Sequence, residues 1–162
     1  MALARRVELV PLERTAAGNA LFSQAQPSDE TLIADLAPHQ PVSLFCHRRQ
    51  TDQLILLRGS LELVVLEDGR LRRIPLREDE PMLVRIPPGV PHGAVNSSRR
   101  YATVVNAVLR HGPPDPRDYR PRPLPHALRE QWRDLMGEPA PAGPPLPAGA
   151  GDRPSHSAPG RG

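Results

Sequence analysis

The sequence predicts an all-β protein whose strands form a sandwich or a closed barrel, with the jelly roll as the expected arrangement. Short apolar segments recur at even spacing with turn residues between them, and no helical period separates them. The dipeptide Asp68-Gly69, flanked by apolar segments, is typical of a tight hairpin turn. A jelly-roll barrel closes its edges and leaves a mouth through which a ligand can enter.

The predicted strands follow in order along the chain. Short apolar stretches bounded by turn residues indicate the first strands, at 7–11, 20–22, 31–36 and 42–46. The middle of the chain predicts consecutive antiparallel pairing of 54–57, 60–66 and 71–76. After a reversal at 78–81, the last strands are expected at 82–86, 92–96 and 101–109.

The region after the barrel divides into two parts. We assign the β-barrel to residues 1–111 and an extended, proline-rich segment with a short helix to 112–136. The helix is expected at 126–136, with Leu128, Trp132 and Leu135 on one face that packs on the barrel exterior or on a partner subunit. Gly137 is the expected helix stop.

The segment 137–162 is rich in proline and glycine and low in apolar bulk. Burial in such a segment cannot repay the entropy of ordering it, so we expect a disordered tail.

The composition excludes several functional classes. All 21 basic residues are arginine, which removes Schiff-base chemistry and lysine general bases. A net charge of only +3 and an aromatic content of 3% argue against a nucleic-acid partner. Cys46 is the single cysteine, and no apolar run is long enough for a membrane helix or a signal peptide, so a cytoplasmic location with no membrane partner is expected.

The segment 86–96 places one imidazole and one amide behind a rigid turn. Pro87 and Pro88 fix φ and remove backbone donors, while Gly89 can adopt the left-handed conformation of a tight turn. The chain then becomes extended, with His92 near the start of the strand and Asn96 near its end. This arrangement aims His92 in a fixed direction.

A second polar cluster lies upstream, from His47 to Gln53, and an apolar run and Gly59 follow it. Together the two segments resemble the signature motifs of the cupins, which are small β-barrels. The second motif matches from Pro87 through Gly89 and His92 to Asn96. The first motif matches in part: His47 stands at the first metal histidine, Arg49 replaces the second, and Gln53 or Asp52 lies near the glutamate position.

This resemblance bears on metal binding. Arg49 would place a permanent positive charge beside a divalent cation, so no metal cofactor is expected. A rearranged ligand set of His47, Asp52 and His92 is the alternative, since strand alternation turns Cys46 to the opposite face from His47.

Without a metal, one polar cavity is expected to contain His47, Arg49, Gln53 and His92, together with Asn106 from the last strand. A buried arginine needs a counter-charge, which Asp52 or a bound anion would supply.

Within the cupins, the chain resembles the dTDP-4-dehydrorhamnose 3,5-epimerases and the related dTDP-sugar ketoisomerases. The similarity is carried by His47 three residues before Gln50, by the turn 87–93, and by the exit 118–121 after the last strand. It implies proton abstraction beside the keto group of a nucleotide-linked deoxysugar, with His47 as the base and with Arg49 and His92 stabilising charge. The remaining candidate substrate contacts are Asp52, Gln53, Asn106 and Tyr119.

In that family a carboxylate orients the base and a tyrosine assists it as an acid. Tyr101 and Tyr119 are the only tyrosines of this chain. Three functions therefore stay open: an epimerase or ketoisomerase, a barrel that binds a sugar or another anion without catalysis, and a metal-dependent cupin with altered ligands. The expected partners are an anionic small-molecule substrate and a second copy of the chain in a homodimer.

Overall fold

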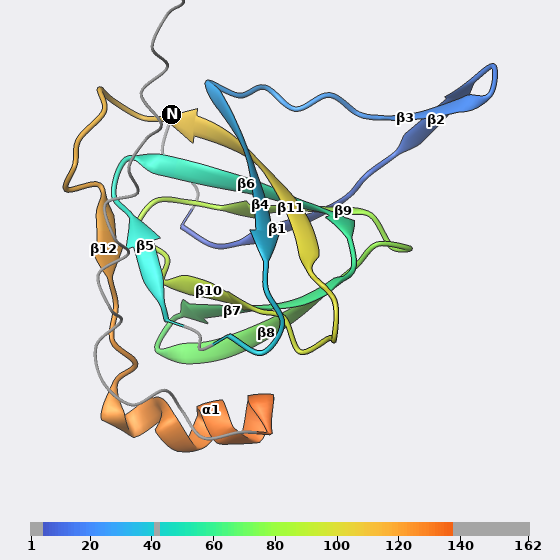
Figure 1. The fold of residues 1–162 in the computed structure, drawn as a ribbon. Coiled ribbons are helices and arrows are strands. Elements are labelled where there is room, and N and C mark those ends of the chain that lie inside the picture. Colours follow the sequence, from blue (N-terminus) through green and yellow to red (C-terminus); the bar gives the residue numbers. More distant parts are fainter. Residues whose placement is uncertain (1–4, 41–42, 138–162) are drawn as a thin grey trace, which may run out of the picture.

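The computed structural model describes residues 5–40 and 43–137 and shows two facing antiparallel sheets of five strands each. In the first sheet the strand order is β1-β9-β6-β11-β4, and in the second it is β12-β5-β10-β7-β8 (Figure 1). The strands of the first sheet are β1 (Glu8–Pro11), β9 (Met82–Ile86), β6 (Gln50–Arg58), β11 (Ala102–Arg110) and β4 (Glu30–Leu36). Those of the second are β12 (Tyr119–Pro121), β5 (Phe45–His47), β10 (His92–Val95), β7 (Ser60–Glu67) and β8 (Arg70–Arg77). The fold is the predicted all-β, cupin-type jelly roll.

The core lies between the two sheets and follows the alternation of apolar residues along the strands. Leu61, Leu63 and Val65 of β7 face it from one side, and Leu56 of β6 and Val84 of β9 face it from the other. This packing leaves room at one end of the sandwich, where polar residues replace aliphatic ones on β5, β6 and β10.

The predicted consecutive pairing is correct for β7 and β8, which form a hairpin from Ser60↔Arg77 to Glu67↔Arg70. It is wrong for β6 and β7, which belong to different sheets. The chain changes sheets at Gly59, whose φ is +86°, and a Cβ on this residue would lie 3.2 Å from the backbone of Ala102. The glycine therefore forms a corner where the sequence had indicated a hairpin.

The strand predicted at 20–22 is present, whereas the strands Arg14–Ala17 and Tyr119–Pro121 were not predicted. A hairpin of β2 (Arg14–Ala17) and β3 (Ala20–Ser23) extends away from the barrel (Figure 1). Its first strand is polar and exposed, which hid it from an apolar pattern. The short strand β12 lies in the segment expected to be extended, and it pairs with β5 through Tyr119↔His47.

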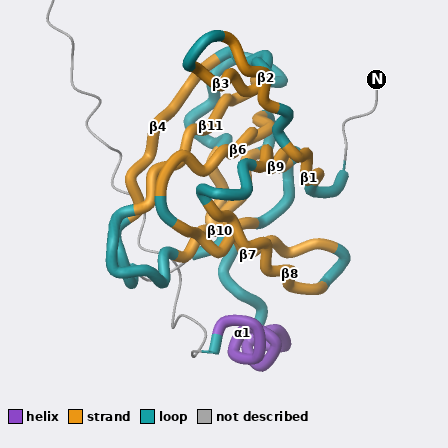
Figure 2. Tube along the Cα trace, turned by 90° about the vertical axis from the view of Figure 1, so that its right-hand side faces the viewer, coloured by secondary structure: helices purple, strands orange, loops and turns teal. Residues whose placement is uncertain are grey.

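The predicted helix is present as a short 3₁₀ turn, His126–Leu128, followed by α1, Arg129–Met136. Figure 2 shows α1 beside β8, at the end of the molecule opposite the β2–β3 hairpin. Trp132 is buried there against Leu44, Val64, Leu71 and Val95, and Gly137 ends the helix with a φ of 70°. The apolar face of the helix thus packs on the barrel exterior, which is the first of the two positions predicted for it.

Apart from Gly137, the predicted tail lies outside the described residues. Within the described part of the chain, no helix combines the length and the apolar character that a membrane crossing requires.

Candidate active site

A cavity of about 480 Å³ lies between the sheets and has a polar and an apolar part. Its polar lining consists of Ser43 and of five residues on five strands: His47, Asp52, His92, Asn106 and Tyr119. The rest of the wall is mostly aliphatic and includes Leu36, Leu54, Leu61, Leu63, Leu76 and Val104. A cavity with a few convergent polar groups on an apolar wall is typical of a small-molecule site.

His47, at the end of β5, is held by a buried carboxylate. Its Nδ1 lies 3.0 Å from Oδ2 of Asp118, the residue just before β12. The other oxygen of Asp118, Oδ1, accepts the backbone N–H groups of Arg48 and Arg49 at 3.0 and 2.6 Å. Because a carboxylate accepts hydrogen bonds, Nδ1 of His47 carries a proton, and in the neutral imidazole Nε2 has the free lone pair.

His92, at the start of β10, is fixed by the rigid turn that precedes it. Its Nδ1 donates to the carbonyl of Val90 at 2.9 Å, so Nε2 is the unprotonated nitrogen. Burial lowers the pKa of His92, although the negative charge of Asp52 opposes this effect. Gly89 in the same turn has a φ of 82° and donates its N–H to the carbonyl of His47. The turn therefore positions both histidines.

Asp52 is buried at the start of β6, between the two imidazoles. Its Oδ1 accepts hydrogen bonds from Gln50 Nε2 and from Asn106 Nδ2, the latter at 2.7 Å. Its Oδ2 lies 3.5 Å from Nε2 of His92 and 3.9 Å from Nε2 of His47. Two histidines and one carboxylate thus meet at the polar end of the cavity.

Two aromatic rings complete this end. Phe45 stacks on Tyr119 with ring centroids 5.0 Å apart, and its centroid is 4.5 Å from that of His92. Burial raises the pKa of the Tyr119 phenol. Tyr119 therefore keeps its proton at neutral pH and can donate it.

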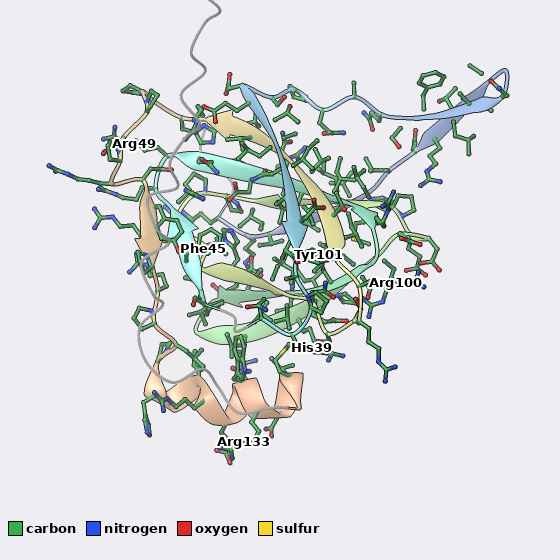
Figure 3. All side chains as sticks on the ribbon, in the orientation of Figure 1. His39, Phe45, Arg49, Arg100, Tyr101 and Arg133 are labelled. Atoms are coloured by element: carbon green, nitrogen blue, oxygen red, sulfur yellow. The ribbon has the colours of Figure 1, made fainter. Side chains whose placement is uncertain are left out.

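The structure brings together five of the seven residues proposed from the sequence: His47, Asp52, His92, Asn106 and Tyr119. Arg49 is instead exposed on the turn after β5 and lies at the periphery in Figure 3, where Phe45 is seen on the barrel wall. The expectation that Arg49 lies in the cavity is wrong, because the chain has left the strand before this residue and its side chain is free to reach solvent.

Gln53 is also outside the cavity. Strand alternation places it on the opposite face of β6 from Asp52, and its Nε2 donates to the carbonyls of Pro27 and Ala107. Its buried amide is therefore satisfied by the protein backbone rather than available to a ligand.

Sequence reasoning missed Asp118 as the partner of His47 and Phe45 as the central ring of the aromatic group. Asp118 lies in the segment 118–121, which carried part of the family resemblance. Its carboxylate, next to Tyr119 in the sequence, could therefore have been proposed as the partner of His47. The contact of Phe45 depends on the pairing of β5 with β10 and β12, which no local pattern encodes.

Among the described residues, no group of three or more histidine, cysteine, aspartate or glutamate side chains is arranged to hold a metal ion.

No protein-family model matches the chain, and no curated protein matches its sequence. Its structure is similar to a dTDP sugar isomerase from Desulfovibrio desulfuricans, with a TM-score of 0.62, 21% identity, and coverage of 78% of this chain and 90% of that one. It is also similar to a variant of a 3,4-ketoisomerase from Thermoanaerobacterium thermosaccharolyticum in complex with TDP-4-keto-6-deoxyglucose. The TM-score is 0.57 and the sequence identity 16%, with 70% of this chain and 85% of that chain covered.

A dTDP-4-dehydrorhamnose 3,5-epimerase from Sulfolobus tokodaii has a TM-score of 0.57 and 14% identity, with 75% of this chain and 78% of that chain covered. The chain therefore has the fold of the dTDP-sugar isomerases and epimerases.

Proposed function

We propose that the protein is an epimerase or isomerase that removes a proton beside the keto group of a nucleotide-linked deoxysugar, without a metal. The observation that carries this proposal is the contact between His47 Nδ1 and Asp118 Oδ2 at 3.0 Å. This contact leaves Nε2 of His47 as an oriented base beside the cavity. The solved structures that share the fold support the choice of substrate class.

Each of the other polar residues has a role in this reaction. As the C–H bond breaks, negative charge develops on the carbonyl oxygen and requires a donor. Tyr119, whose phenol stays protonated, is the proposed donor, and Asn106 and Asp52 contact the hydroxyl groups of the sugar. The aliphatic wall suits the deoxy carbon of the substrate.

The negatively charged part of the substrate requires positive charge near the cavity. Arg48 and Arg49 follow His47 directly, and Asp115 lies close enough to them and to Arg117 to feel their charges. The pKa of Asp115 is lowered chiefly by the backbone N–H of Arg117, and the three guanidinium groups add to this effect. No ion pair within 4.0 Å occupies these arginines in the described chain, so we assign Arg49 to the diphosphate, outside the cavity.

We also propose that the protein is a homodimer. The β2–β3 hairpin leaves the barrel, and its Leu21 and Phe22 are 64% and 59% exposed. An isolated two-stranded hairpin is only marginally stable in water, so a second copy of the chain is the expected support.

The test is solvent exchange at the carbon beside the carbonyl. The protein is incubated with TDP-4-keto-6-deoxyglucose in heavy water, and deuterium in the sugar is followed by mass spectrometry. The wild type is expected to introduce deuterium, and His47→Asn is expected to be slower by about 10²–10⁴-fold, the usual contribution of a general base. Binding of the nucleotide sugar without any exchange would instead identify the non-catalytic binding protein.

A further inference from the structure

The polar end of the cavity contains a carboxylate oxygen to which the proposed reaction assigns only a contact with a sugar hydroxyl group. Oδ1 of Asp52 is occupied by the amides of Gln50 and Asn106. Oδ2 has no hydrogen-bond donor among the described residues, and its polar neighbours are Nε2 of His92 at 3.5 Å and Nε2 of His47 at 3.9 Å. Asp52 itself is 3% exposed, so the cavity is where this oxygen meets a ligand.

When both imidazoles are neutral, all three of these atoms are hydrogen-bond acceptors. The protons of the two imidazoles are on their Nδ1 atoms, because Val90 O and Asp118 Oδ2 accept there. Burial lowers the pKa of His92 and so favours its neutral form. Three converging acceptors without a donor are complementary to a ligand that brings its own donors, such as the hydroxyl groups of a sugar.

We propose that Asp52, supported by His92, is a second proton acceptor of the site and takes the proton of a hydroxyl group on the carbon next to the carbonyl. This inference rests on the proposed function, because it needs His47 to remove the C–H proton first. It assigns Asp52 a catalytic role beyond substrate binding.

The reaction balances with the groups present. His47 Nε2 takes the proton from the hydroxyl-bearing carbon, the C–H electrons form a carbon–carbon double bond, and the carbonyl oxygen takes a proton from Tyr119. Asp52 then takes the proton of the original hydroxyl, whose O–H electrons form the new carbonyl. The double-bond electrons accept the proton of His47 at the former carbonyl carbon, and the proton on Asp52 returns through water to the Tyr119 phenolate.

This role determines the class of reaction. Epimerisation needs proton exchange at carbon only, whereas the hydroxyl must lose its proton when the carbonyl moves to the adjacent carbon. A carboxylate placed for that proton therefore favours an α-hydroxy ketone as the substrate and carbonyl transposition as the reaction.

The experiment follows two readouts in one sample of TDP-4-keto-6-deoxyglucose in heavy water: deuterium at carbon, and the carbonyl position by ¹³C NMR. The wild type is expected both to introduce deuterium at carbon and to move the carbonyl to the adjacent carbon. Asp52→Asn keeps an acceptor for Gln50 and Asn106 but removes the second base. It is expected to retain exchange within about tenfold and to lose transposition by about 10²–10⁴-fold. Asp134→Asn, an exposed carboxylate on α1, is the matched control and should leave both rates unchanged.

The outcomes separate the two proposals. Absence of exchange in the wild type contradicts the proposed function. Exchange without transposition in the wild type, or equal loss of both rates in folded Asp52→Asn, overturns the inference alone. If Asp52→Asn fails to fold, Asp52→Ala with added formate replaces it, and transposition that does not recover with formate in the folded protein counts against the role.

Discussion

At the scale of single residues, the two oxygens of Asp118 have different tasks. One accepts two backbone N–H groups from the turn after β5, and the other orients the imidazole of His47. The first task fixes the carboxylate relative to the strand, so the second sets the direction of the imidazole without help from a ligand. The turn and the imidazole of His47 thus depend on one side chain.

Replacing this carboxylate is the first test at this scale. Asp118→Asn keeps an oxygen for the turn, but its amide N–H₂ now donates to Nδ1 of His47 and moves the imidazole proton to Nε2. We expect solvent exchange to fall by about 10²-fold or more, because the base then has the wrong tautomer. The rate is measured by the same deuterium assay.

A structural explanation of that loss is checked separately. The ¹⁵N chemical shifts of labelled histidine should show that the proton of His47 has moved from Nδ1 to Nε2, while the thermal midpoint changes little. Normal exchange by Asp118→Asn would show that the pair does not orient the base.

Five of the seven site residues predicted from the sequence line the cavity, and the two errors have physical causes. His47, Asp52 and His92 were predicted to share the cavity because they stand in the two segments that resemble the cupin motifs, and all three line it. Arg49 and Gln53 were misplaced because their positions depend on where β5 ends and on the phase of β6. A shift of one residue moves a side chain to the other face of a strand.

At the scale of elements, Gly59 marks the corner at which the chain passes from one sheet to the other. Its φ is +86°, and an added Cβ would lie 3.2 Å from both Ala102 Cα and Tyr101 O. Gly69, in the β7–β8 turn, also has a positive φ, of +73°, but no atom lies within 4 Å of an added Cβ. A substitution at Gly69 therefore tests backbone strain alone, whereas one at Gly59 tests strain and crowding together.

We expect Gly59→Ala to lower the free energy of unfolding by about 3 kcal/mol, since left-handed strain and overpacking add. Gly69→Ala should cost about 1–2 kcal/mol, from the strain alone. Urea denaturation measures both variants. Equal losses would mean that the corner tolerates a side chain.

The pairing of the elements was less predictable than their existence. Most strands were found from apolar alternation, and the β7–β8 turn from Asp68-Gly69. The separation of β6 and β7 into different sheets is a long-range property, and the sequence around Gly59 is compatible with a hairpin as well as with a corner.

At the scale of the whole molecule, the β2–β3 hairpin is the feature that the barrel does not explain. All of its strand residues except Ala20 are exposed, and Ile33 on the edge strand β4 is 71% exposed as well. Apolar side chains on a projecting arm and on a sheet edge favour association.

The dimer is tested by replacing both Leu21 and Phe22 with serine. Light scattering after gel filtration should give twice the chain mass for the wild type and the single chain mass for the double variant. Thr15→Ser, at the position that pairs with Phe22, is the control and should remain dimeric. A wild-type protein that is monomeric at all concentrations tested would contradict the proposal.

The most direct measurement of the central claim, that His47 held by Asp118 removes a proton beside a carbonyl, is the ¹H NMR signal of that proton in heavy water. With TDP-4-keto-6-deoxyglucose, the signal should disappear in the presence of the wild type and persist with His47→Asn over the same time. A signal that disappears equally fast with both proteins would show that His47 is not the base.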